Sequence, residues 1–400
     1  MFRHSDFMAR LLGRSQGLFQ KDFEIFHGQL ESRVSRCRIL VVGAAGSIGS
    51  HFVKQLMALG PKGLCLVDPS ENNLVELVRD LRSSDMVFPG DFSTVSIALG
   101  TPMFERFLAS VIPFDVVVNF AALKHVRSER DPFSTMRMIK TNILDMAWWL
   151  DELERTPPQR FFSVSSDKAV QPASLMGASK AMMERLMFLA SRTYPCSSAR
   201  FANVAFSDGS LLHGFLRRLE KGQPLSAPND IKRYFISHEE AGQLCLLACF
   251  LGGHREIFVP RLDQNLDLKS FADIAVLLLQ DRGLEPELCR DEKQARAFAR
   301  RRDPQDRRWP CCFTPSDTSG EKPYEEFFDA GETLDDTRFE NIVVVKGPPV
   351  HEIRVREALT GLSALFDSPH WDVEGMAYCL GLAIPELQHL ARGKNLDEKM

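Results

Sequence analysis

Residues 38–52, RILVVGAAGSIGSHF, join a short apolar run to a glycine-rich turn and then to the start of an amphipathic segment. Gly43, Gly46 and Gly49 have the spacing G-x-x-G-x-x-G. Glycines let the backbone turn tightly and approach a diphosphate, whose charge is stabilised by the N–H groups at a helix start. The stretch therefore predicts a strand, a turn and a helix that bind a dinucleotide, with Ser47 and Ile48 in the same turn.

The next apolar run, GLCLVD, ends at Asp68, 19 residues after Gly49. A carboxylate at this place accepts hydrogen bonds from the ribose hydroxyls of the adenosine and repels a 2′-phosphate. Because no arginine or lysine follows directly in DPSENN, the sequence favours NAD over NADP. Asp91, read as the end of a third strand, is either a contact of the adenine amino group or a turn and helix-capping residue. Ala121, after the fourth strand, is also assigned to the cofactor site.

Short apolar runs continue along the chain and alternate with amphipathic segments. Continuous apolar strands separated by helices indicate a parallel sheet covered on both faces. The fold expected is therefore a Rossmann-type, doubly wound α/β domain, with ligands beyond the carboxyl ends of the strands. The strands expected are 38–43, 63–68, 86–91, 115–122, 160–166 and 197–204.

Four regions follow from these patterns. Residues 1–36 have helical apolar spacing and form an N-terminal extension, and residues 37–205 form the cofactor-binding core with the catalytic residues. Residues 206–345 are expected to be mainly a smaller substrate-binding region with some returning core elements. Residues 346–400 are expected to be a C-terminal helical extension.

Composition excludes several classes of protein. The formal charge of −4 over 400 residues gives no general attraction to nucleic acid or to anionic lipid. Nine cysteines without a C-x-x-C pair indicate reduced thiols in the cytoplasm, and no metal site is expected. The N-terminus lacks the apolar core of a signal peptide, and no segment has the ~20 apolar residues of a membrane span.

Residues 165–180, SSDKAVQPASLMGASK, contain half of a Tyr-x-x-x-Lys pair. Lys180 is present, but the position four residues earlier is Met176, which cannot carry a proton. Either this likeness is accidental, or the proton chemistry lies at Ser166, Asp167 and Lys168.

Five ordered blocks of sequence resemble one family. Together they are similar to the nucleotide-sugar 4,6-dehydratases of the extended short-chain dehydrogenase/reductase superfamily, and most to the polysaccharide-biosynthesis group that acts on UDP-N-acetylglucosamine. The resemblance covers roughly residues 38–260, with a fainter match at SGEKPYEEFF (319–328). The blocks are NFAALKHV (119–126), TNI (141–143), SSDKAVQPASLMGASK (165–180), RFANVAFSDGSLL (200–212) and KRYFIS (232–237).

The resemblance implies a hydro-lyase that removes water from C5 and C6 of a sugar after NAD has taken a hydride from C4. Asp167 would protonate the departing C6 hydroxyl, Lys168 would take the C5 proton, and Ser166 would hydrogen-bond the C4 oxygen. Lys180 would contact the nicotinamide ribose. Members of this group can carry methionine where Met176 stands, which leaves open the base for the C4 hydroxyl. Asp167, acting through Ser166 or water, is the preferred candidate.

The substrate side is assigned in the same way. Lys124 is expected to contact the substrate or the active site, and His125 has either a direct or a structural role. Asn203 matches a position that contacts the diphosphate, and Arg233 lies where a basic residue meets the nucleotide or its phosphates. The segment KHVRSERDP (124–132) is one residue shorter than usual in the family, which indicates a subgroup with its own substrate preference.

Two smaller assignments concern supporting residues. Asn142 is expected to orient the catalytic helix or to serve at a helix start, and Arg200 to take part in the packing of its strand or in an ion-pair network. The protein is also expected to form a homo-oligomer.

The conclusion from the sequence is a cytoplasmic, NAD-dependent dehydratase that makes a 4-keto-6-deoxy N-acetylhexosamine nucleotide for surface-glycan or nonulosonic-acid synthesis. Two alternatives remain. One is a 4-epimerase on the same fold, and the other is a protein that binds a nucleotide without catalysis. The sequence decides neither UDP against GDP nor the C5 configuration of the product.

Overall fold

A computed structural model describes residues 4–124, 129, 131–262, 268–316 and 325–388. In these residues the main sheet has nine strands in the order β14-β15-β10-β6-β5-β4-β1-β2-β3. The strands from β3 to β10 run parallel, whereas β15 and β14 are antiparallel additions at one edge. The strands are β1 (Arg38–Val42), β2 (Gly63–Val67), β3 (Asp91–Val95), β4 (Val116–Asn119), β5 (Arg160–Val164), β6 (Cys196–Ala199), β10 (Glu256–Pro260), β14 (Thr333–Asp335) and β15 (Ile342–Lys346).

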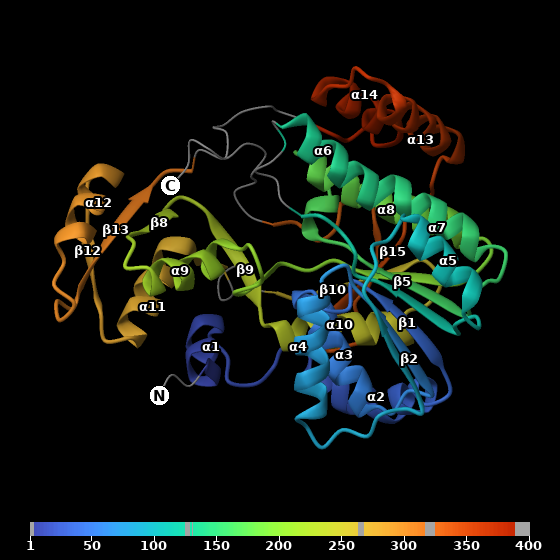
Figure 1. Ribbon diagram of the computed structural model, residues 1–400, viewed down its shortest axis with the longest axis horizontal. Coiled ribbons are helices and arrows are strands. Elements are labelled where there is room, and N and C mark those ends of the chain that lie inside the picture. Colours follow the sequence, from blue (N-terminus) through green and yellow to red (C-terminus); the bar gives the residue numbers. More distant parts are fainter. Residues whose placement is uncertain (1–3, 125–128, 130, 263–267, 317–324, 389–400) are drawn as a thin grey trace.

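Helices cover both faces of this sheet (Figure 1). One apolar layer lies beneath α2 (Gln20–Val34), α3 (Ser47–Ala58), α4 (Glu71–Arg82) and α10 (His238–Leu251). The other lies beneath α5 (Pro102–Ser110), α6 (Pro132–Ile139), α7 (Asp145–Leu153), α8 (Leu175–Ala190), α13 (Glu352–Asp367) and α14 (Val373–Ala383). The expected doubly wound, Rossmann-type α/β fold is confirmed.

A smaller lobe lies beside the sheet at the left of Figure 1. It holds a parallel sheet of β8 (Leu225–Pro228), β13 (Arg308–Thr314) and β12 (Glu285–Leu288), with α9 (Leu211–Glu220), α11 (Phe271–Asp281) and α12 (Glu292–Arg301). The short strands β7 (Asn203–Val204), β9 (Lys232–Ile236) and β11 (Leu268–Ser270) form a third sheet. The two helices of region 1–36 separate, because α1 (His4–Leu12) packs on the lobe and α2 packs on the core.

Helix α8 is buried on almost all sides, since α13 and α14 cover the face that the sheet does not. This explains its apolar, methionine-rich sequence, which would be unusual in a helix with a solvent-facing side. Its N-terminus is capped twice. Ser174 Oγ accepts a hydrogen bond from the Gly177 N–H at 3.1 Å, and the Glu129 carboxylate accepts from the N–H groups of Leu175 and Met176.

The expected third strand, 86–91, is wrong. The strand begins at Asp91 and pairs with β2 through DFSTV, in the register Gly63↔Asp91 to Val67↔Val95. Pro89, which lacks an N–H group, and Gly90 precede it and are poor strand residues. Sequence reasoning missed the strand because β3 is an exposed edge strand with polar side chains.

The expected strand 197–204 is also wrong as a single element. The chain leaves the main sheet after Ala199, and Asn203–Val204 form β7 in another sheet, parallel to β9. The other expected strands are confirmed, with ends that differ by one to three residues.

Candidate functional site

The glycine turn lies at the carboxyl end of β1 and leads into α3. Gly43 has a φ of +78°, and a Cβ there would come within 2.6 Å of the Ala121 nitrogen. A Cβ on Gly49 would be 2.2 Å from the Gly43 carbonyl oxygen. Gly46 differs, because its Cβ would approach no atom closer than 3.5 Å. The turn itself therefore needs glycine at positions 43 and 49. Gly46 leaves open space at the helix start, as a diphosphate requires.

Asp68 follows β2 beside this turn, and its side chain is buried. Its Oδ2 accepts a hydrogen bond from the Ala45 N–H at 3.1 Å, and its Oδ1 accepts from the Ser70 N–H at 2.9 Å. Burial raises the pKa of the Asp68 carboxyl, and these two hydrogen bonds oppose that shift. The carboxylate is thus fixed beside the glycine turn, in the place expected for a ribose contact. Ala121 is held nearby, since its N–H donates to Asn119 Oδ1 at 2.9 Å.

The structure does not support the expected adenine contact of Asp91. Asp91 pairs with Gly63, the first residue of β2, so it lies at the amino edge of the sheet, whereas the glycine turn lies at the carboxyl edge. Its carboxylate instead accepts a hydrogen bond from Arg38 Nε at 2.7 Å. The error follows directly from the misplaced strand, and Asp91 is removed from the proposed cofactor site.

The catalytic candidates lie on one short turn at the carboxyl end of β5. Ser166 precedes the 3-10 turn Asp167–Ala169 and caps it, its Oγ accepting from the Lys168 N–H at 3.2 Å. Ser166 Oγ also donates to Asp167 Oδ1 at 2.7 Å, and Lys168 Nζ lies 3.1 Å from Asp167 Oδ2. The Asp167 side chain is 6% exposed and that of Lys168 is 37% exposed. The three side chains therefore form one hydrogen-bonded group, with the lysine toward the open side.

Lys180 is fully buried on α8, and its Nζ donates to the Val164 carbonyl oxygen at 3.4 Å. Burial lowers the pKa of Lys180 to about 8, against the opposing charge of Glu184. Met176, one turn earlier, lies in the apolar core at 3% exposure. The Met176 side chain thus has a packing role, and the proton chemistry must come from other residues.

A buried ion-pair network supports this helix. Arg200 contacts Glu184 through two hydrogen bonds, at 2.8 and 2.7 Å, and contacts Glu332 at 3.0 Å. Ser165 Oγ also donates to Glu184, at 2.6 Å. The network links α8 to Ser165, just before the turn Asp167–Ala169, and to the segment before β14, which confirms the structural role expected for Arg200.

Asn142 joins the loop after β4 to the same helix. It lies in a π-helical turn, Lys140–Leu144, and its Nδ2 donates to Ser179 Oγ and to the Leu123 carbonyl oxygen, both at 2.9 Å. Its Oδ1 accepts from the Leu123 N–H at 2.8 Å. This geometry supports the expected orienting role.

The structure places only some of the residues assigned to the substrate near the proposed site. Lys124 Nζ lies 3.3 Å from Ser207 Oγ, at the junction between the core and the lobe. Nearby, Ser47 Oγ accepts from the Asp208 N–H at 3.0 Å. Burial and the charge of Lys168 lower the pKa of Lys124. His125 lies outside the described residues.

Asn203 and Arg233 both contact Glu325, a residue that sequence reasoning left without a role. Asn203 Nδ2 donates to Glu325 Oε1 at 2.5 Å, and Arg233 Nε lies 3.4 Å from the same oxygen. The Tyr234 N–H donates to Oε2 at 3.1 Å. Glu325 belongs to the stretch 319–328 that resembled the family, which was the one signal for it in the sequence. Asn203 and Arg233, which were expected to contact the diphosphate or the nucleotide, thus both contact the Glu325 carboxylate.

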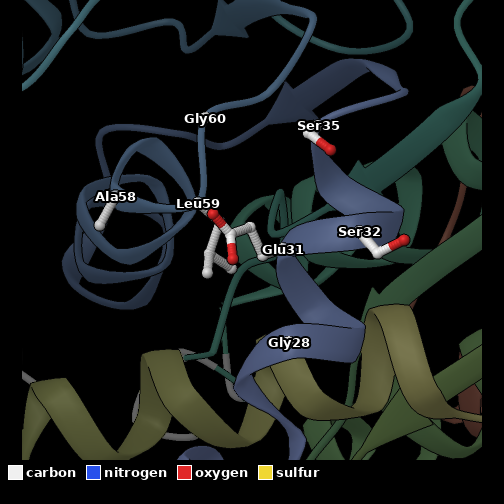
Figure 2. A pocket seen from close by; sticks show the side chains of 7 residues that line it. All are labelled: Gly28, Glu31, Ser32, Ser35, Ala58, Leu59 and Gly60. Atoms are coloured by element: carbon white, nitrogen blue, oxygen red, sulfur yellow. The ribbon is translucent and has the colours of Figure 1, made fainter.

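A pocket lies elsewhere, between α2 and the end of α3 (Figure 2). Apart from Leu59, its lining residues are small or polar, and Glu31 is the charged residue among them. The loop after α3 leads to the start of β2, so this pocket is near the amino edge of the sheet, away from the glycine turn. It therefore does not extend the site. The lining residues are Gly28, Glu31, Ser32, Ser35, Ala58, Leu59 and Gly60.

Two absences can be stated for the described part of the chain. None of its helices combines the length and the apolar character needed to cross a bilayer. Within the same residues, His, Cys, Asp and Glu side chains form no group of three or more that could hold a metal ion.

The profile of a polysaccharide biosynthesis protein family matches residues 39–347. The chain belongs to this family. The match spans the core, the turn Asp167–Ala169 and the lobe, and it confirms the resemblance to extended short-chain dehydrogenase/reductases of the nucleotide-sugar dehydratase group at the level of the family.

The individual relatives have sequence identities of 26–33% to this chain. A probable polysaccharide biosynthesis protein of Bacillus subtilis, EpsC, is 31% identical over 66% of this chain, which spans 43% of that protein's length. An uncharacterised membrane protein of Methanocaldococcus jannaschii is 33% identical over 62% of this chain and 74% of its own. A Campylobacter jejuni UDP-N-acetylglucosamine 4,6-dehydratase (inverting) is 28% identical, over 56% of this chain and 66% of its own. A UDP-glucose 4-epimerase of Rickettsia canadensis is 26% identical, over 56% and 65%.

Solved structures confirm the fold. Pen from Bacillus thuringiensis superposes with a TM-score of 0.64 at 18% identity, covering 79% of this chain and 89% of that one. The dTDP-glucose 4,6-dehydratase DesIV from Streptomyces venezuelae, solved with NAD bound, gives a TM-score of 0.52 at 21% identity, covering 68% and 88%.

Proposed function

We propose that the protein catalyses the NAD-dependent 4,6-dehydration of a nucleotide-activated N-acetylhexosamine, with UDP-N-acetylglucosamine as the first substrate to test. The observation that carries the proposal is the hydrogen-bonded group of Ser166, Asp167 and Lys168 after β5, beside a buried Lys180. A dedicated acid and base next to the sugar are what dehydration needs beyond simple C4 oxidation. The likeness to the Campylobacter dehydratase supports the same choice.

The residues present fit NAD. The turn formed by Gly43 and Gly49, the open space at Gly46 and the first N–H groups of α3 suit a diphosphate, and Asp68 suits the ribose hydroxyls. Lys180 would hold the nicotinamide ribose. When bound, NAD supplies the acceptor for the C4 hydride and returns that hydride to C6. The buried Asp68 carboxylate also disfavours a 2′-phosphate, which supports NAD over NADP.

The chain's own groups would move the protons. The C4 hydroxyl proton passes through Ser166 Oγ to Asp167, along the 2.7 Å hydrogen bond between them. Lys168 Nζ then takes the C5 proton. Asp167 gives its proton to the C6 hydroxyl, which leaves as water when the C6–O bond breaks. Lys168 returns a proton to C5, after exchange with solvent, as C6 receives the hydride. Asp167 and Lys168 thus both end each cycle as they began, and this sequence accounts for a site in which Met176 carries no proton.

The product test separates dehydration from epimerisation. Purified protein is incubated with UDP- and GDP-N-acetylglucosamine in deuterated water, and the products are analysed by mass spectrometry and NMR. Loss of one water with deuterium at C5 is the expected result. An isomer of unchanged mass with inverted C4 would instead establish the epimerase, an activity named for the Rickettsia relative.

Two substitutions test the roles. Asp167→Asn and Lys168→Ala should each block dehydration while NAD still binds, because neither side chain lies in the glycine turn. Asp336→Asn and Lys221→Ala are matched controls at exposed positions and should leave turnover unchanged. Near-normal dehydration in both Asp167→Asn and Lys168→Ala would refute the assignments.

We propose that the reaction takes place in the cytoplasm. All nine cysteines are free thiols, which suits a reducing compartment.

A further inference from the structure

The loop 205–210 leads from β7 into α9 of the lobe and contacts the core at two points. The Asp208 N–H donates to the Oγ of Ser47, the first residue of α3, at 3.0 Å. The neighbouring hydroxyl oxygen, Ser207 Oγ, accepts from Lys124 Nζ at 3.3 Å. Ser47 follows β1 and Lys124 follows β4, so adjacent residues of one loop fasten it beyond the carboxyl ends of two neighbouring strands.

The backbone of this loop is strained at Phe206. Two turns follow one another, and each is closed by a backbone hydrogen bond, from Ser207 to Val204 at 3.2 Å and from Ser210 to Ser207 at 2.9 Å. The third residue of each turn has a positive φ, +60° at Phe206 and +70° at Gly209. Glycine suits this position, whereas a bulky side chain is strained there. Phe206 therefore indicates a loop whose shape is imposed by contacts on either side of it.

Those contacts differ in kind on the two sides of the loop. On the lobe side the Phe206 ring packs against Phe7 of α1, with ring centroids 5.9 Å apart, and adjoins the apolar cluster of the lobe. On the core side the contacts are the polar ones of Ser47 and Lys124. A hydrogen bond that can be exchanged for water contributes less to stability than a packed aromatic ring. The core side is therefore the one that can open.

Ser47 lies where the diphosphate of the cofactor is expected. It follows Gly46, where an added Cβ would meet no atom closer than 3.5 Å. Because Ser47 Oγ accepts the Asp208 N–H, its own hydroxyl hydrogen remains available as a donor to an anion. One side chain can therefore hold the loop and a diphosphate oxygen at the same time. Closure of the loop and binding of the cofactor would then stabilise each other.

We propose that the loop 205–210 is a clasp that retains NAD, because its hydrogen bonds to Ser47 and Lys124 must open before the cofactor can leave. This inference rests on the proposed function. In that reaction the hydride taken from C4 is returned to C6, so NAD is regenerated in every cycle and need not leave between turnovers. A loop that slows the release of NAD therefore does not slow the reaction.

The rate at which NAD dissociates tests the clasp. Protein loaded with NAD, without a sugar, is mixed with an excess of a scavenging dehydrogenase and its substrate, which convert released NAD to fluorescent NADH. Ser207→Ala removes the acceptor for Lys124, and Asp208→Pro removes the N–H that is donated to Ser47. Each variant should release NAD about fivefold faster than the wild type, the factor that corresponds to the loss of one ordinary hydrogen bond.

Asp208→Ala is the matched control. It keeps the backbone N–H and removes a carboxylate that is 74% exposed, so NAD should leave it at the wild-type rate. Wild-type release from both Ser207→Ala and Asp208→Pro would overturn the proposal. Release from Asp208→Ala as fast as from Asp208→Pro would overturn it too, because the effect would then belong to the side chain and not to the N–H.

Hydrogen exchange gives a second measurement that needs no turnover. NAD should slow exchange of the amides in 205–210 by about fivefold, because closure and binding are linked, and Ser207→Ala should reduce this protection. Amides of β8, elsewhere in the lobe, should exchange equally with and without NAD. Equal exchange of 205–210 in both states would show a merely structural loop and refute the clasp. If both measurements agree with the clasp but no nucleotide sugar is dehydrated, the proposed function fails and the clasp does not.

Discussion

Asn142 Nδ2 donates a hydrogen bond to Ser179 Oγ at 2.9 Å and so ties the loop after β4 to the helix that carries Lys180. The same amide exchanges two hydrogen bonds with the Leu123 backbone. One buried side chain therefore sets the distance between the loop expected at the nicotinamide and the lysine expected at its ribose.

Asn142→Ala should lower both stability and turnover. It leaves the partly buried Leu123 N–H and carbonyl without their side-chain partner, which costs up to about 1–3 kcal/mol for each unsatisfied group. Ser179→Ala is the control, because Asn142 keeps its bonds to Leu123, and its cost should be smaller. Urea unfolding gives the stability and steady-state assays give kcat. An equal loss in the two variants would contradict the role of the Leu123 bonds.

Gly49→Ala should lower stability, whereas Gly46→Ala should lower the affinity for NAD. The Cβ on Gly49 would lie 2.2 Å from the Gly43 carbonyl oxygen, so the backbone must shift, at about 1–3 kcal/mol as for other overpacked sites. At Gly46 the nearest atom would be 3.5 Å away, so stability should hold while NAD affinity falls. Thermal unfolding and calorimetric titration with NAD measure the two quantities. A strong NAD complex of Gly46→Ala would show that this position does not face the diphosphate.

Asp68→Asn should weaken NAD binding and reduce the preference over NADP. The amide has one acceptor oxygen for the two N–H groups that the carboxylate now binds, so a modest loss of about 1–2 kcal/mol in stability is also expected. Fluorescence titration with both cofactors measures the affinity ratio, and Asp80→Asn on α4 is an exposed control. An unchanged ratio would remove Asp68 from the ribose site.

The sequence was sufficient for the parts of the fold that depend on continuous apolar strands and glycine spacing. β1, β2, β4 and β5 are buried and apolar, and the turn at Gly43 and Gly49 is set by close backbone contacts that a Cβ would break. It failed at β3, since an exposed edge strand is not constrained to be apolar, and this error moved Asp91 to the wrong end of the sheet.

The site was predicted best where its residues are neighbours in the sequence or follow neighbouring strands of the sheet. Ser166, Asp167 and Lys168 share one turn, so their hydrogen bonds follow from local geometry. The contact of Glu325 with Asn203 joins residues 122 positions apart. Such a contact depends on how the lobe packs against the core, and no local pattern indicates it. The buried Glu184–Arg200 pair is likewise a contact that no local pattern indicates. The i, i+4 spacing of Lys180 and Glu184 was nevertheless a signal that these two side chains share one helix face.

Lys180 should make stability depend on pH in the alkaline range. Its pKa is lowered from 10.5 to about 8 by burial, so between these values the unfolded chain binds more protons than the folded one. The free energy of unfolding contributed by this group therefore rises with pH through that window. The penalty below pH 8 corresponds to about 3 kcal/mol.

Lys180→Met isolates this effect. The variant should be more stable than the wild type below pH 8, and the difference should shrink toward pH 10.5. Comparison with the wild type at each pH removes the contribution of the buried thiols and of Tyr194, because burial raises their pKa values in both proteins alike. Lys62→Met, at an exposed position, serves as the control. Urea unfolding from pH 7 upward measures the difference, and a value that does not change with pH would show that Lys180 keeps an ordinary pKa in the folded protein.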